Sequence, residues 1–136
     1  MAVIKELVIN DKTYTFNFGI GFLKEIDATS TAVIDQLGNS AKNGFHQAVL
    51  GLIDGNPEDL VRVLMAANKG RVPRIQEAEL IGYLDEIDTE ALCGEVMGFL
   101  SEPGPCKKMF EASKAQGERV KEMQAKALEK LTEQMA

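Results

Sequence analysis

The feature of this 136-residue sequence that most constrains its fold is a run of alternating aromatic and polar side chains near its start. Tyr14, Phe16 and Phe18 fall on one side of an extended chain and polar residues fall on the other, which is the period of a half-buried strand. The preceding apolar run, Leu7–Ile9, and the turn-forming residues between the two runs predict a β-hairpin. A two-stranded ribbon is only marginally stable alone, so its aromatic face must pack on helices or on another chain.

After this hairpin the apolar residues recur at helical spacing. The pattern predicts helices near residues 20–28, from Phe45 to Gly55 and from Pro57 to Gly70. It predicts a fourth helix around Leu80–Leu84 that ends in the acidic residues 85–88, and a fifth that buries apolar residues from Leu92 to Leu100. Asn56 supplies an N-cap for one of these helices, and Asp88 or Thr89 supplies one for the last. The predicted fold class is therefore α+β and mainly α, with an N-terminal β-hairpin followed by a bundle of about five short helices.

The short segment Pro103–Pro105 interrupts the chain, because each proline lacks an N–H and disfavours a helical conformation in the residue before it. The charge balance changes at the same point: residues 1–101 carry 8 basic and 15 acidic side chains, and residues 102–136 carry 7 and 6. We therefore expect a globular body over residues 1–101 and a charged tail, helical or flexible, over residues 102–136.

The tail has the alternating charges of a solvated helix. Its thin apolar seam consists of Val120, Met123, Ala127 and Leu131. Gly117 lowers the stability of the middle of this helix by about 1 kcal/mol. Such a seam rarely holds a helix on its own, so the tail is better explained if it meets a partner.

Composition and charge exclude several classes of partner. The formal net charge of −6 has the wrong sign for neutralising phosphates, so we expect no nucleic acid. No apolar run approaches the roughly 18 residues that cross a bilayer, and the charged start of the chain does not resemble a secretory signal. We expect a cytoplasmic protein without membrane association. Two cysteines are too few for a disulfide framework, and we expect both to be reduced.

The candidate catalytic side chains are few. His46 is the only histidine, and we interpret it as an ordinary residue at a helix start. Cys93 falls on a face predicted to be buried, where a thiol behaves as a small hydrophobe. Cys106 precedes Lys107 and Lys108, whose positive charges favour a lowered thiol pKa and a reactive cysteine. Adventitious reactivity explains this thiol better than a designed role, and we expect no catalytic site.

An acidic cluster over residues 85–90 is the strongest metal-site candidate in the sequence. An EF-hand loop needs oxygen ligands at alternate positions and a glycine at the sixth, but Ile87 and Thr89 stand where that pattern requires ligands or glycine. The cluster is better interpreted as solvated acids at the end of one helix and the start of the next. No phosphate-binding or dinucleotide-binding motif occurs, so we expect neither metal nor cofactor.

The residues from Leu7 to Asp27 resemble the start of the tail assembly chaperones of long-tailed phages and prophages of Gram-positive bacteria. Those proteins begin with a hairpin of the form I-N-G-K-x-Y followed by a G-F-L-x-E-apolar-D run. Here the corresponding stretches are Ile9–Tyr14 and Gly21–Asp27, with Asp11 in place of the usual turn glycine. The likeness covers residues 4–101.

This resemblance implies a non-enzymatic helper in the cytoplasm of the bacterial host, absent from the mature virion. It implies that the chain binds the tape-measure protein, keeps it soluble and helps recruit tail-tube protein during tail morphogenesis. It also implies a homo-oligomer, as a ring or a spiral. Candidate partner-binding residues are the hairpin aromatics and the apolar residues of the tail: Tyr14, Phe16, Phe18, Met109, Phe110, Val120, Met123 and Leu131. The alternative interpretation of these positions is plain core.

Two other functions remain open from the sequence. An acidic inhibitor that mimics DNA and blocks a nucleic-acid-binding enzyme would fit the net charge, although such mimics usually carry a denser acidic surface. A small enzyme that uses His46 and Cys93 is a third alternative.

Overall fold

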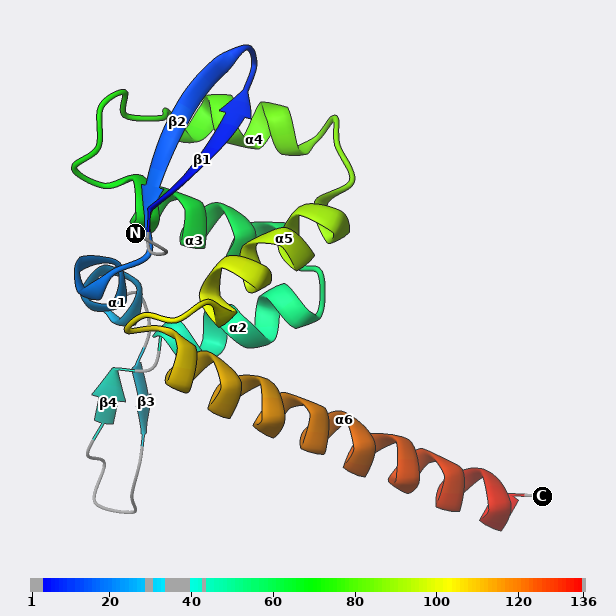
Figure 1. Ribbon diagram of the computed structural model, residues 1–136. Helices are drawn as coiled ribbons and strands as arrows, with labels where there is room; N and C mark the ends of the chain where they lie inside the picture. Colours follow the sequence, from blue (N-terminus) through cyan, green and yellow to red (C-terminus); the bar gives the residue numbers. More distant parts are fainter. Residues whose placement is uncertain (1–3, 29–30, 34–39, 43, 136) are drawn as a thin grey trace.

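The computed structural model describes residues 4–28, 31–33, 40–42 and 44–135; for residues 31–33, 40–42, 120 and 135 it describes the backbone alone. The chain is a mainly helical α+β fold that opens with a β-hairpin, as predicted (Figure 1). The strands are β1 (Ile4–Ile9), β2 (Lys12–Asn17), β3 (Thr31–Val33) and β4 (Ser40–Lys42). The helices are α1 (Ile20–Asp27), α2 (Gly44–Ile53), α3 (Pro57–Asn68), α4 (Glu77–Leu84), α5 (Thr89–Ser101) and α6 (Lys107–Met135).

The β1–β2 hairpin is antiparallel, and Leu7 pairs with Tyr14 across it. Asn10 and Asp11 form its turn with positive φ angles of 51° and 66°. Two positive φ angles are what a type I′ hairpin turn requires, and Asn and Asp tolerate this conformation better than other non-glycine residues. Asn10 and Asp11 therefore form this turn without a glycine.

The aromatic face of the hairpin is buried in the core, as its alternation predicts. Phe16 is fully buried. Phe18 packs edge-on against Phe22 of α1 with ring centroids 5.2 Å apart, and Phe22 in turn meets Phe45 of α2 at 6.3 Å. The hairpin lies over α3 and α4 (Figure 1), where the Tyr14 hydroxyl donates a hydrogen bond to Glu79 over 3.1 Å. The ribbon thus gains from the helices the stability that it lacks alone.

The predicted helix starts are confirmed by their caps. The Asn56 side chain accepts a hydrogen bond from the backbone N–H of Glu58 at 2.9 Å, and Pro57 is the first residue of α3. Asp88 accepts from the backbone N–H groups of Glu90 and Ala91 at the start of α5. These bonds satisfy donors that have no partner within their own helix.

A second antiparallel hairpin, β3–β4, was not predicted from the sequence. Thr31 pairs with Lys42, and Val33 pairs with Ser40. Each strand is three residues long, which is too short for an alternation of polar and apolar residues to identify it.

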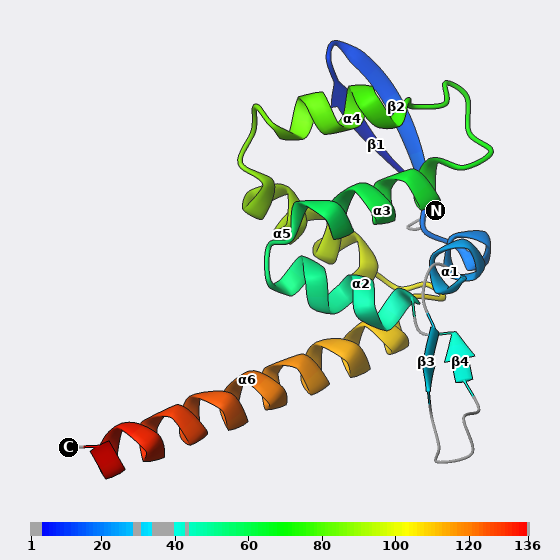
Figure 2. The ribbon, with the colours of Figure 1, turned by 180° about the vertical axis from the view of Figure 1, so that it is seen from behind.

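The Pro103–Pro105 segment separates two helices, because α5 ends at Ser101 and α6 begins at Lys107. The prediction of a solvated helix holds for the second half of α6, where every described side chain from residue 118 onward is exposed. It is wrong for the first turns, since Phe110 and Ser113 are buried against α2 and α5. Figures 1 and 2 show α6 leaving the body in a straight line beyond these turns.

Candidate functional site: an exposed helix face and a groove

The predicted partner-binding residues fall into two groups. Four are buried in the core: Tyr14, Phe16, Phe18 and Phe110. Three are exposed on α6: Met109, Met123 and Leu131. The side chain of Val120 lies outside the described residues. The four buried side chains pack the body together, as the alternative interpretation of these positions as core describes. The three exposed side chains are accessible to a partner.

A close approach between α6 and α2 fixes the direction of α6. A Cβ added at Gly117 would stand 2.8 Å from Leu50 Cδ2 and 3.4 Å from Ile53 Cδ1. The sequence presents Gly117 only as a weak point of the helix; in the fold its missing side chain is the space into which Leu50 fits. Only glycine lets the two helices pack at this distance without a shift of these side chains.

Two polar contacts hold α6 on either side of this glycine. Toward the start of the helix, His46 Nδ1 and Ser113 Oγ form a hydrogen bond of 2.9 Å. Toward the free end, Lys121 Nζ lies 3.0 Å from Asp54 Oδ1 in an exposed ion pair. His46 therefore has a structural partner, in keeping with its interpretation as an ordinary residue at a helix start.

Beyond Lys121 the apolar side of α6 continues without a covering element. Met123, Leu128 and Leu131 are 70%, 65% and 53% exposed. Leu131 follows the buried Phe110 by a multiple of seven residues, so both side chains lie near the same side of the helix. We call Met123, Leu128 and Leu131 the α6 face. Leu128 and Leu131 extend the docked side of α6 past the end of α2, where the body no longer covers it, and Met123 borders them on one flank.

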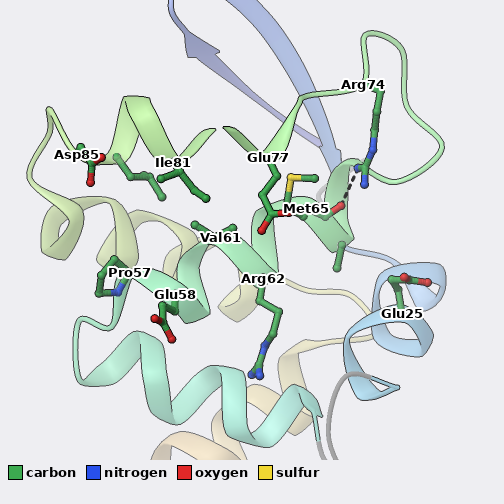
Figure 3. A pocket seen from close by; sticks show the side chains of 12 residues that line it. Glu25, Pro57, Glu58, Val61, Arg62, Met65, Arg74, Glu77, Ile81 and Asp85 are labelled. Carbon is green, nitrogen blue, oxygen red and sulfur yellow. Dashed lines mark hydrogen bonds between the residues drawn. The ribbon is translucent and has the colours of Figure 1, made fainter. Parts of the chain in front are cut away.

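A groove of about 720 Å³ lies between α3 and α4 (Figure 3). Its floor is apolar and consists of Pro57, Val61, Met65, Ala66, Ile81 and Leu84. Its rim is charged and consists of Glu25, Glu58, Arg62, Arg74, Glu77 and Asp85. An apolar floor with a charged rim is the arrangement in which an amphipathic helix docks.

The rim of this groove carries a net negative charge, because it has four carboxylates and two arginines. Arg74 donates from Nη1 to the backbone carbonyl of Met65 at 2.8 Å (Figure 3), and Arg62 pairs with Asp59 at 2.9 Å. The rim carboxylates Glu58, Glu77 and Asp85, in contrast, make no ion pair within the described part of the chain. The groove therefore favours a partner that brings positive charge.

Buried Asn68 holds the loop that positions α4 along the groove. Its Nδ2 donates to the carbonyl of Thr15 at 3.0 Å and to that of Pro73 at 3.3 Å, and its Oδ1 accepts from the N–H of Ile75 at 2.8 Å. One amide thus ties the end of α3 to β2 and to the loop before α4. The only sequence signal of this role is a polar residue near the end of an apolar stripe.

Both thiols are buried, which makes the expectation of a reactive Cys106 wrong. Burial raises the pKa of the Cys106 thiol to about 12, because a thiolate there would lose its hydration. The thiol donates to the carbonyl of Phe18 at 3.1 Å. Burial, with Asp59 and Glu90 adding to it, also raises the pKa of Cys93. Desolvation outweighs the lysines next to Cys106, so neither thiol is set up as a nucleophile.

The described residues hold no cluster of metal-ligating side chains. None of the helices in the described ranges is long and apolar enough to span a membrane.

Comparison with known families finds a match over residues 6–114 to the family described as "Phage tail assembly chaperone protein, TAC". The chain belongs to the phage tail assembly chaperone family. The match runs from β1 into the first turns of α6, so it includes the buried residues Phe110 and Ser113 and ends just before Gly117. The first turns of α6 are therefore within the family region, and the Gly117 contact and the projecting half of this chaperone's α6 are outside it. Comparison with curated proteins and with solved structures finds no match.

Proposed function

We propose that this tail assembly chaperone binds the tape-measure protein of a long-tailed phage or prophage of Gram-positive bacteria and keeps it soluble in the host cytoplasm. It then helps recruit tail-tube protein and is not retained in the mature virion. The role is one of protein binding and not of catalysis, and the chaperone works as a homo-oligomer. Family membership supports the general role, and the exposed surfaces support the binding steps.

The observation that carries this proposal is the uncovered α6 face. A helix whose apolar side extends past its own body loses little ordering entropy when a second helix packs against it, because its backbone is already helical. Met123 suits a surface that accepts many similar segments, since methionine is flexible and polarizable. Binding through this face would cover apolar stripes on a long helical client and so prevent the client's aggregation.

The test is co-expression of the tape-measure protein with a tagged chaperone. Ending the chain at Ser101 would remove the buried Phe110 from the core, so substitutions on the exposed half of α6 are the better probes. We expect the unaltered chain to hold the tape measure in the soluble fraction and to co-elute with it. The double variant Met123→Glu, Leu131→Glu should lose this capture, because it places charge in the apolar contact.

Ala115→Glu is the matched control, since it adds the same charge at an exposed position on the side of α6 that faces away from Leu128 and Leu131. It should capture the tape measure as well as the unaltered chain does. Equal loss in both variants, or no capture by any variant, would refute a role for the α6 face.

A further inference from the structure

We infer that the groove between α3 and α4 binds the projecting half of α6 from a second copy of the chain, head to tail. This inference rests on the proposed homo-oligomeric state and names the two surfaces that produce it. It can fail while the binding of the tape-measure protein stands. Two observations support it. The uncovered α6 face is about as long as the apolar groove, and the cations beside that face are opposite in charge to the carboxylates of the groove rim.

The lengths of the two surfaces match. Helix α3, which forms one wall of the groove, has 12 residues and is therefore about 18 Å long. The part of α6 beyond Lys121 that is described as helix is about 21 Å long. Ile81, which α4 contributes to the apolar lining of the groove, is 43% exposed and can meet an incoming apolar side chain.

The groove cannot be filled by the same copy's α6. Helix α6 is fixed on α2 at Gly117 and Lys121 and continues away from the body. Figures 1 and 2 both show α2 and α3 between α6 and α4, with the free end of α6 pointing outward. The end of a straight helix fixed in this way does not return to α4, so the occupant comes from another molecule.

The charges along α6 are sorted by side. Three cations lie in one row next to the α6 face: Arg119, Lys126 and Lys130. Four carboxylates lie on the opposite side of the helix: Glu118, Glu122, Glu129 and Glu133. The ion pair of Lys126 with Glu122 is 3.5 Å long and largely exposed, so it competes weakly for that cation.

This row of cations is complementary to the groove. When the α6 face enters the groove, the cations lie along a rim whose carboxylates Glu58, Glu77 and Asp85 are without ion-pair partners among the described residues. Complementary charges of this kind fix the register and orientation of a docked helix. A second copy therefore brings both the apolar side chains and the charge that the groove favours.

Each copy then has one groove and one α6 end, so the contact is heterologous. Such contacts form rings when the rotation between copies closes and open spirals when it does not. The contact would also cover the α6 face in the free chaperone, so the tape-measure protein would compete with the neighbouring copy for it.

The experiment is sedimentation velocity on the purified full chain from micromolar to near-millimolar concentration. We expect mass above that of the 14.9 kDa monomer, increasing with concentration. Ile81→Glu in the groove and Leu131→Glu on α6 should each weaken the association by about thirtyfold or more. Ala115→Glu, on the side of α6 away from the α6 face, should leave it unchanged. Circular dichroism of each variant checks that the helices are retained.

Mixing the two defective variants gives the decisive result. The Ile81→Glu copy keeps an intact α6, and the Leu131→Glu copy keeps an intact groove, so an equimolar mixture should form a one-to-one dimer and grow no further. A charge exchange gives a second readout: Glu77→Lys with Asp85→Lys, or Lys126→Glu with Lys130→Glu, should each weaken the association about tenfold, and all four together should restore it.

Three results would overturn the inference. Association that persists in Ile81→Glu would assign the α6 face to pairing with another α6. Failure of the mixed variants to form a dimer would refute the groove as the acceptor. A chain that stays monomeric at every concentration would refute self-association itself. Retained capture of the tape-measure protein by Ile81→Glu would show in each case that the binding of the tape-measure protein stands independently.

Discussion

Gly117 of α6 lies against Leu50 of α2 so closely that a Cβ on the glycine would stand 2.8 Å from the leucine Cδ2. This contact fixes where α6 leaves the body. The direction in which the rest of α6, including the α6 face, projects from the body therefore depends on the absence of a side chain at position 117.

Replacing Gly117 by leucine should therefore undock α6. The added side chain cannot fit against Leu50, and overpacking of this kind costs about 1–3 kcal/mol. Urea unfolding would measure the loss. Gly117→Ala should be nearly neutral, because the helix propensity gained, about 1 kcal/mol, offsets a small shift of the Leu50 end.

Gly94 of α5 provides the control for that comparison. A Cβ there would meet nothing within 4 Å, so Gly94→Ala should stabilise the chain by about 1 kcal/mol. If Gly117→Leu were as stable as the unaltered chain, the close packing of α6 on α2 would be contradicted.

Asn68→Leu should destabilise the fold by about 2–4 kcal/mol. The substitution leaves the carbonyl of Thr15 and the N–H of Ile75 without the bonds that the amide supplies, and unsatisfied buried backbone groups are costly. Thermal and urea denaturation would report the loss. A change of under about 0.5 kcal/mol would show that water or a shifted loop satisfies these groups.

Cys106 should make stability depend on pH in the alkaline range. Its folded-state pKa is raised from 9.0 to about 12, so the unfolded chain ionises first and is favoured as the pH rises from about 9 toward 12. Below pH 9 the thiol is protonated in both states and has no such effect. Cys106→Ala should lose less stability between pH 8 and pH 10.5 than the unaltered chain, as measured by urea titration at each pH.

The same burial predicts slow alkylation of the native thiols. At pH 8, iodoacetamide should modify neither Cys93 nor Cys106 until denaturant unfolds the chain. Mass spectrometry over time distinguishes the outcomes, and rapid labelling of Cys106 in the native state would contradict its burial.

The sequence predicts most of the secondary structure because its local signals agree. Period-two alternation identifies the first hairpin, and caps such as Asn56 and Asp88 locate the helix starts to within a residue. These features depend on residues that are close together in the chain, so they can be predicted from a single sequence.

The features that escaped prediction depend on distant residues. Strands β3 and β4 are too short to show a period, and the fit of Gly117 to Leu50 exists only once α2 and α6 meet. One sequence signal indicates that one side of α6 packs against the body: multiples of seven residues separate Phe110, Gly117 and Leu131. This spacing does not show at which residue the body stops covering the helix. The groove is likewise a product of two helices and has no signature in either.

The most direct test of the central claim is photocrosslinking from α6 in the complex with the tape-measure protein. A photoreactive amino acid at position 128, on the α6 face, should crosslink to the tape measure, and the same group at position 122, on the opposite side, should not. Equal crosslinking from both positions, or none from position 128 while the tape measure stays soluble, would contradict binding through the α6 face.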